Sequence, residues 1–137
     1  MTAMPDLATI TAELAEWLAA QPLDDLPAVA SVDILGPHRV LTEWGAAVKI
    51  QLSHTGGGLT TLADWAEHLS TTVAVTRHRD IVRAAITTST PSGHRIALWT
   101  HLDFTAQHAL TASGLPAASD SPIEITAAQL RAAINHH

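Results

Sequence analysis

Two histidines and one aspartate, His101, Asp103 and His108, are the side chains best suited to chemistry. Imidazole and carboxylate groups ligate zinc and other divalent ions, and an imidazole oriented by a carboxylate can act as a general base. Their spacing matches no metal or catalytic motif, and the chain holds nine histidines, so scattered surface imidazoles are the competing interpretation. We keep these three residues as candidate metal ligands and expect no cofactor.

A second candidate is the glycine-rich segment 53–58, Ser-His-Thr-Gly-Gly-Gly, between an expected strand and an expected helix. Backbone amides at a helix N-terminus can cradle a phosphate or carboxylate. A P-loop would need a lysine after the glycines, and a dinucleotide fingerprint would need a parallel strand–helix–strand unit. A connector is therefore the favoured interpretation of this segment.

The third candidate is a surface rather than a motif. Apolar residues alternate with polar ones in 47–53, and in 95–101 Ile96 and Leu98 have the two-residue spacing of a core-facing strand side, so each segment reads as a strand with one buried face. Trp and Arg are common energetic anchors of protein interfaces, and both types fall on the polar side. The alternative is that the C-terminal helices fold back and bury Trp99 as ordinary core. The predicted binding surface consists of Lys49, Gln51, Arg83, Arg95, Trp99 and His101.

These residues need a scaffold, and the stretch 59–102 predicts one. It reads as an amphipathic helix followed by three strands, with turn signals at Arg79, Asp80 and 91–93. Asp6 is a plausible N-cap for an earlier helix, and Thr126 with Gln129 forms a capping-box pattern for a last one. We expect helices at 6–21, 59–69, 105–113 and from 126 onward, and strands at 28–35, 39–44, 47–53, 72–77, 81–88 and 95–101.

The first half of the chain resembles the second. A shift of 48 residues places Trp17 on Trp65 and Val48 on Ile96, which suggests repeat units 6–53 and 59–102 followed by a helical tail, 104–135. Chance matches between two helix-and-hairpin segments in an Ala- and Leu-rich chain are the alternative. In outline a tandem α-β-β-β arrangement resembles small inhibitor and PepSY-type domains. Both tryptophans are expected to seal helix against sheet.

The fold prediction follows from these elements. It is an α+β fold with an antiparallel sheet of five to six strands, helices packed on one face, and possibly a tandem α-β-β-β duplication. Residues 1–137 are expected to form a single domain, because a chain of this length can bury one core.

Composition narrows the function classes. The chain is 47% apolar and 15% charged and has no cysteine, which excludes disulfides and thiolate ligands. Its net charge of −6 disfavours binding to a nucleic-acid backbone. No apolar run approaches the roughly 20 residues of a membrane helix. The start of the chain lacks the pattern of a signal peptide, so we expect a cytoplasmic protein that does not engage membranes.

The sequence thus favours a small non-enzymatic interaction module, an adaptor, inhibitor or accessory factor, that acts as a homodimer or in a complex with another protein. The alternative is a small-molecule-binding or enzymatic α+β cone fold with a pocket between sheet and helices. Length and a leading helix resemble the SnoaL and NTF2-like kind of cone fold, although that fold places more helix before its sheet.

Overall fold

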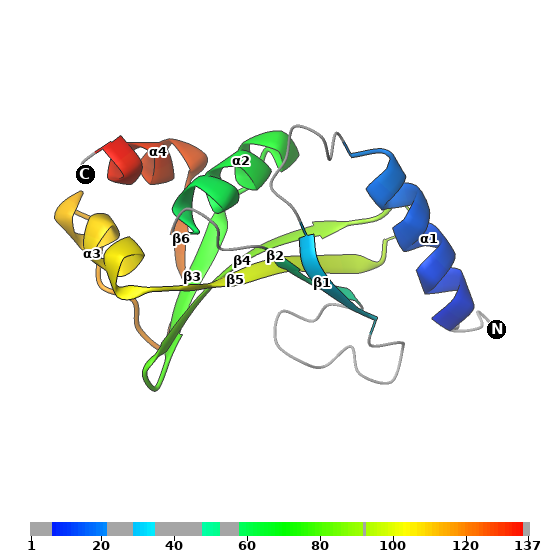
Figure 1. Cartoon of the computed structure of the whole chain (residues 1–137), viewed down its shortest axis with the longest axis horizontal. Helices are drawn as coiled ribbons and strands as arrows, with labels where there is room; N and C mark the ends of the chain where they lie inside the picture. The colour runs from blue at the N-terminus through cyan, green and yellow to red at the C-terminus, as the bar shows by residue number, and fades with distance from the viewer. Residues whose placement is uncertain (1–6, 22–28, 35–47, 53–57, 92, 136–137) are drawn as a thin grey trace.

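The computed structural model describes residues 7–21, 29–34, 48–52, 58–91 and 93–135. Within these residues helices and strands mix along the chain (Figure 1). The helices are α1 (Leu7–Ala19), α2 (Leu59–Leu69), α3 (Phe104–Ala112) and α4 (Ala127–Asn135). The strands are β1 (Val29–Ile34), β2 (Val48–Leu52), β3 (Val73–His78), β4 (Ile81–Ser89), β5 (Arg95–Leu102) and β6 (Ile123–Ile125).

The described strands form one sheet in the order β1-β2-β5-β4-β3-β6. Every neighbouring pair is antiparallel except β2 and β5, which run parallel with Val48 opposite Ile96 and Ile50 opposite Leu98. The α+β prediction is confirmed, and the expectation of a purely antiparallel sheet is corrected at this one pair. A parallel pair needs a long crossover, and α2 with the β3–β4 hairpin supplies it.

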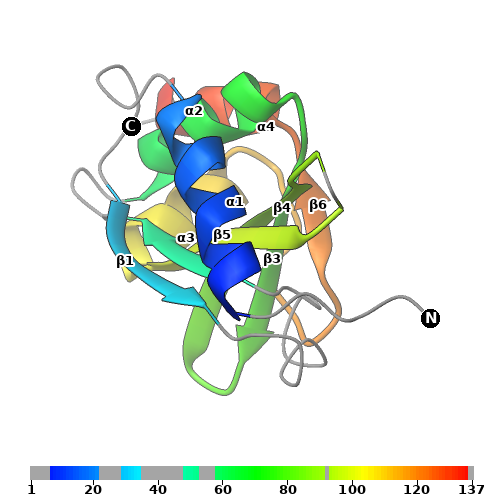
Figure 2. The same cartoon turned by 90° about the vertical axis from the view of Figure 1, so that its right-hand side faces the viewer.

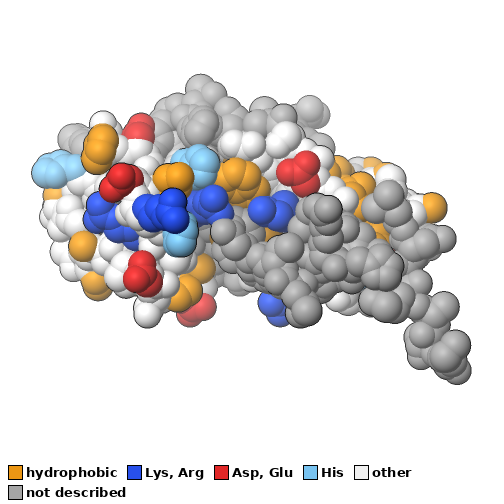
Figure 3. Space-filling view, turned by 90° about the horizontal axis from the view of Figure 1, so that it is seen from below, with side chains coloured by type: hydrophobic (Ala, Val, Ile, Leu, Met, Phe, Trp, Pro, Cys, Tyr) orange, Lys and Arg blue, Asp and Glu red, His pale blue; other side chains and the backbone are white. Residues whose placement is uncertain are grey.

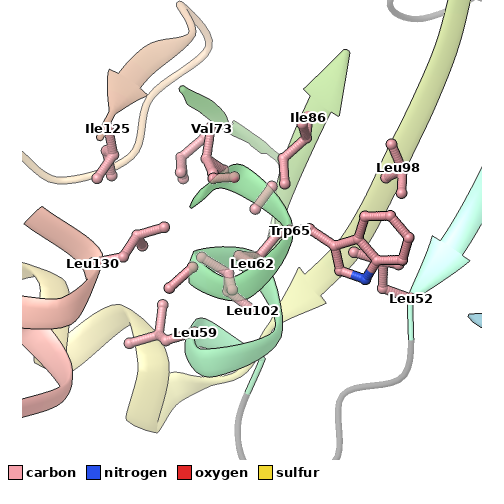
Figure 4. Close-up of a cluster of buried hydrophobic side chains, with 14 of the residues drawn as sticks. Leu52, Leu59, Leu62, Trp65, Val73, Ile86, Leu98, Leu102, Ile125 and Leu130 are labelled. Atoms are coloured by element: carbon pink, nitrogen blue, oxygen red, sulfur yellow. The ribbon is translucent and has the colours of Figure 1, made fainter. Parts of the chain in front are cut away.

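The core lies on the face of the sheet that carries the helices. Leu62 and Trp65 of α2 are fully buried against Ile86 of β4 and Leu98 of β5 (Figure 4). Trp17 of α1 stacks on Trp65, with ring centroids 6.3 Å apart and planes 16° apart. The interpretation of both tryptophans as core is therefore confirmed.

The C-terminal helix packs beside α2 and not on the opposite face of the sheet (Figure 1). Its Leu130 belongs to the core, and Arg131 binds Asp64 and Glu67 of α2. The predicted capping box is present, because the Gln129 amide donates to the Thr126 hydroxyl while the Thr126 amide donates to the Gln129 side chain. The alternative in which this helix buries Trp99 is therefore wrong.

Strand β6 was not expected, since three residues are too few to show an alternation. It extends the sheet by pairing Ile125 with Val73. Helix α3 begins one residue earlier than the expected range of 105–113, and its N-cap is Asp103. Asp103 caps the helix because its carboxylate accepts a hydrogen bond from the Ala106 amide at 2.8 Å.

Helix α1 covers the end of the sheet away from α3 (Figures 1 and 2). The Glu13 carboxylate contacts Nδ1 of His94, which ties α1 to the turn between β4 and β5. No helix in the described ranges is long and apolar enough to cross a membrane. The expected strand 39–44 lies outside the described residues, so the tandem duplication stays a prediction.

Candidate interaction surface

The register of β5 decides which side chains form the candidate site. Ile96 and Leu98 are fully buried on the helix side, whereas Trp99 and His101 are partly exposed on the other side. The predicted alternation is therefore confirmed. We call the side of the sheet away from α2 and α4 the outer sheet face. Its residues on the three central strands include Lys49 and Gln51 of β2, Arg83 and Ala85 of β4, and Arg95, Ala97, Trp99 and His101 of β5.

Trp99 is the centre of this face, and two cations approach its ring. The Lys49 Nζ lies 5.7 Å from the ring centroid and the Arg83 Cζ lies 5.9 Å from it. The His101 ring meets the indole edge-on, with centroids 5.0 Å apart and planes 67° apart. Cations within about 6 Å of an aromatic centroid are attracted by the ring quadrupole. The arrangement fixes an aromatic platform between two positive charges.

Strand pairing explains why these side chains meet. Lys49 pairs with Ala97 and Arg83 pairs with His101, so both cations are diagonal neighbours of Trp99. Diagonal neighbours in a sheet are within reach of long and aromatic side chains. Ala97, with 0% of its surface exposed, leaves room for the lysine stem to lean toward the indole. The sequence showed the period of the strands but not this role of a small residue, because the role depends on which strands are neighbours.

Charge is unevenly distributed over the outer sheet face. On the three central strands the described outward side chains include Lys49, Arg83 and Arg95 and no carboxylate. Carboxylates occur on the two edge strands, Asp33 opposite Lys49 on β1 and Glu124 on β6. Figure 3 shows this face with basic side chains in a row and histidines beside them. In a protein of net charge −6, the described basic side chains thus gather on the central strands of this face.

The structure places the other predicted surface residues at the margin of this group. Gln51 lies directly across from Trp99 and accepts a hydrogen bond from the Ser31 hydroxyl at 3.3 Å. Arg95 is exposed at the first position of β5, paired with Ser89. Four of the six predicted residues therefore form one contact cluster around the indole, and two flank it.

The candidate metal ligands are not brought together. His101 lies on the outer sheet face, the Asp103 carboxylate caps α3, and His108 is exposed on that helix. In the part of the chain that the structure describes, no group of three His, Asp or Glu side chains could hold a metal ion. The hypothesis fails because the backbone turns from strand to helix at Asp103, which takes the carboxylate as a cap.

The glycine-rich segment is described only at its last residue. Gly58 precedes α2 with φ of 85°, a left-handed conformation that disfavours a side chain. Its carbonyl accepts the first helical hydrogen bond, from the Leu62 amide at 3.0 Å. Residues 53–57 lie outside the described residues, so the anion-site hypothesis for this segment stays untested.

Comparisons with known proteins do not assign the chain to a family. No family model matches the chain, and no curated protein and no solved structure matches it.

Proposed function

We propose that the protein is a non-enzymatic interaction module whose outer sheet face binds an acidic surface of another protein. The observation that carries the proposal is the partly exposed Trp99 between Lys49 and Arg83. Trp and Arg are the residue types most enriched among the side chains that dominate interface energy. Neighbouring strands of the core hold them in place, so little ordering remains to be done on binding.

Charge favours an acidic partner over a second copy bound through the same face. A symmetric dimer would bring Lys49 and Arg83 of one copy toward the same residues of the other, and like charges at an interface are costly. An acidic patch on a different protein would meet the central cations, while Asp33 and Glu124 at the two edges would disfavour sideways shifts.

Affinity purification with matched variants tests the proposal. The wild-type protein, Trp99→Ala, Arg83→Glu and Arg79→Glu are immobilised, and retained proteins are quantified by mass spectrometry. Arg79 is exposed in the turn between β3 and β4, so its reversal gives the same charge change beyond the strands. We expect a partner that wild type and Arg79→Glu retain and that the other two variants lose.

The retained partner is then purified and titrated by calorimetry. Trp99→Ala should weaken binding by at least about 2 kcal/mol, or roughly thirtyfold, and the affinity of the wild type should fall with added salt. Circular dichroism of each variant verifies that it is folded. Equal retention of all partners by wild type and Arg83→Glu would refute the proposal.

Self-association is measured separately by light scattering over a range of concentrations. If the wild type is a dimer and Arg83→Glu is a monomer, the outer sheet face binds a second copy of the chain and not an acidic partner. A monomer in both cases leaves the acidic partner as the proposed ligand.

A further inference from the structure

A cavity of about 290 Å³ lies on the helix side of the sheet, opposite the outer sheet face. It is bounded by α3, the ends of β3 and β4, strand β6 and residues 116–118, and it is partly open to solvent. Its apolar walls include Val75 and Val82 of the sheet, Leu110 of α3, and Ile123 and Ile125 of β6.

The cavity exists because small residues set the position of α3. Ala106 and Ala109 are the buried positions on its sheet side, together with Leu110. The facing segment, Pro116 with Ala117 and Ala118, also carries short side chains. The short side chains of 116–118 leave space above Val75 and Val82 on that side of the cavity.

An exposed aromatic ring stands at the rim. Phe104, the first residue of α3, lines the cavity, and 86% of its surface is exposed. Large apolar side chains in contact with an open apolar cavity are typical of ligand sites, where a guest covers them. An apolar guest in this cavity would remove part of the phenyl ring from water.

The polar groups at the rim are cationic or neutral. Arg77 lines the cavity, and its Nε donates to the Arg79 carbonyl at 3.1 Å, which anchors the guanidinium beside the opening. His108 of α3 also lines the cavity, and the described lining residues include no Asp or Glu. Among the described residues no carboxylate lies within ion-pair distance of Arg77. A guanidinium fork is suited to binding a carboxylate through two parallel hydrogen bonds.

We propose that this cavity binds a small amphipathic carboxylate. Its apolar body lies against Leu110, Val75 and Phe104, and its carboxylate is bound by Arg77. The inference does not depend on the function proposed for the outer sheet face, because the two sites lie on opposite sides of the sheet.

Volume limits the guest to a small molecule. The cavity has space for roughly ten water molecules at about 30 Å³ each and lies at the lower end of small-molecule pockets, which start at about 300 Å³. That space suits a chain of about eight carbons, with the carboxylate at the opening.

Calorimetric titration with sodium octanoate, below its micellar concentration, tests the site. Octan-1-ol has the same chain without charge, and butyrate has the same charge on a short chain. We expect saturable 1:1 binding of octanoate, weaker binding of octanol and the weakest binding of butyrate. Methyl carbon–proton spectra should place the largest shifts at Leu110 and Val75.

Three variants connect binding to this cavity. Arg77→Gln should weaken octanoate binding about tenfold, because one charged hydrogen-bonding group is lost. The affinity for octanol should not change. Arg79→Gln makes the same charge change two residues away, outside the cavity lining, and should leave both affinities unchanged. Thr111→Phe should abolish binding of both by filling the space. Thr111 is exposed and its hydroxyl donates only within α3, so the fold should tolerate the change.

Several outcomes would overturn the inference. They are the absence of saturable octanoate binding to the wild type, binding that survives Thr111→Phe, and an equal loss in Arg77→Gln and Arg79→Gln. Light scattering tests whether a second copy of the chain occupies the cavity instead. If octanoate does not bind, and the wild type is a dimer that Phe104→Ala converts to a monomer, the cavity is an interface between copies of the chain.

Discussion

The two faces of the sheet are built from alternate residues of the same strands, yet their contents differ. On the helix side Ile50, Ile96 and Leu98 are fully buried. On the outer sheet face their sequence neighbours Lys49 and Trp99 are partly exposed and in contact. Because a strand turns successive side chains to opposite faces, one face can hold the fold together while the other varies for recognition. The same substitution on the two faces should therefore have different consequences.

The largest expected effect comes from truncating a tryptophan on each face. Trp65→Ala removes a fully buried indole that stacks on Trp17, so it should lower the free energy of unfolding by about 3–5 kcal/mol. Trp99→Ala should cost clearly less, because the Trp99 ring is partly exposed. Urea denaturation of both variants measures the two costs. Equal costs would mean that the outer sheet face is a second core, which would remove the basis of the proposed function.

The sequence predicted which residues lie on which face of the sheet, but it did not predict which strands are neighbours. Period-2 alternation predicted that Ile96 and Trp99 lie on opposite faces, and helix 59–69 was predicted at both ends. Periodicity carries no information about which strand lies beside which or in what direction, so the parallel β2–β5 pair was missed. The cluster of Lys49 and Arg83 at the indole depends on that pairing, as does the part played by Ala97.

Other parts of the structure left weaker signals in the sequence. Strand β6 is only three residues long and depends on β3 for its pairing. The cavity beneath α3 results from small residues in segments far apart in the chain, which no local pattern reports. His101 and Asp103 are close in sequence, but His101 lies on a strand whereas the Asp103 carboxylate caps helix α3.

Asp103→Ala tests how firmly the wall of the cavity is held. The substitution removes the N-cap hydrogen bond from the Ala106 amide in the first turn of α3, so we expect a loss of about 1 kcal/mol in unfolding free energy. Amide hydrogen exchange should increase in 104–107 before it changes elsewhere. Unchanged exchange in that turn would show that burial of Ala106 and Leu110 alone fixes the helix.

Lys49→Gln sharpens the description of the indole platform. The Nζ of Lys49 lies 5.7 Å from the Trp99 centroid, and a partly exposed cation–π contact contributes roughly 0.5–1 kcal/mol. We expect a loss of that size in the wild-type background and a much smaller one in Trp99→Ala. A double-mutant cycle by urea denaturation measures the difference. Independent costs in the two backgrounds would mean that the lysine and the indole do not interact.

The smallest effect is expected for the ion pairs that join α4 to α2. The pKa of Arg131 is raised, first by its hydrogen bond to Asp64 and then by Glu67, against an opposing effect of burial. A raised pKa means that the stabilisation is present below the ordinary value of arginine and is lost only as pH rises past the folded value, so it should be constant near neutrality. The Arg131 side chain is 39% exposed, which leaves solvent and salt to screen the pair.

Arg131→Gln should therefore cost about 0.2–1 kcal/mol of unfolding free energy at low salt and close to nothing in 1 M salt. Leu130→Ala, at the adjacent buried position, should cost about 2–5 kcal/mol at both salt concentrations. If instead Arg131→Gln released α4 from the sheet, measured as rapid exchange of amides 128–134, then charge rather than burial would hold this helix. In that case side-chain charges would be needed on both faces of the sheet. The two faces would then differ less than the buried position of Leu130 indicates.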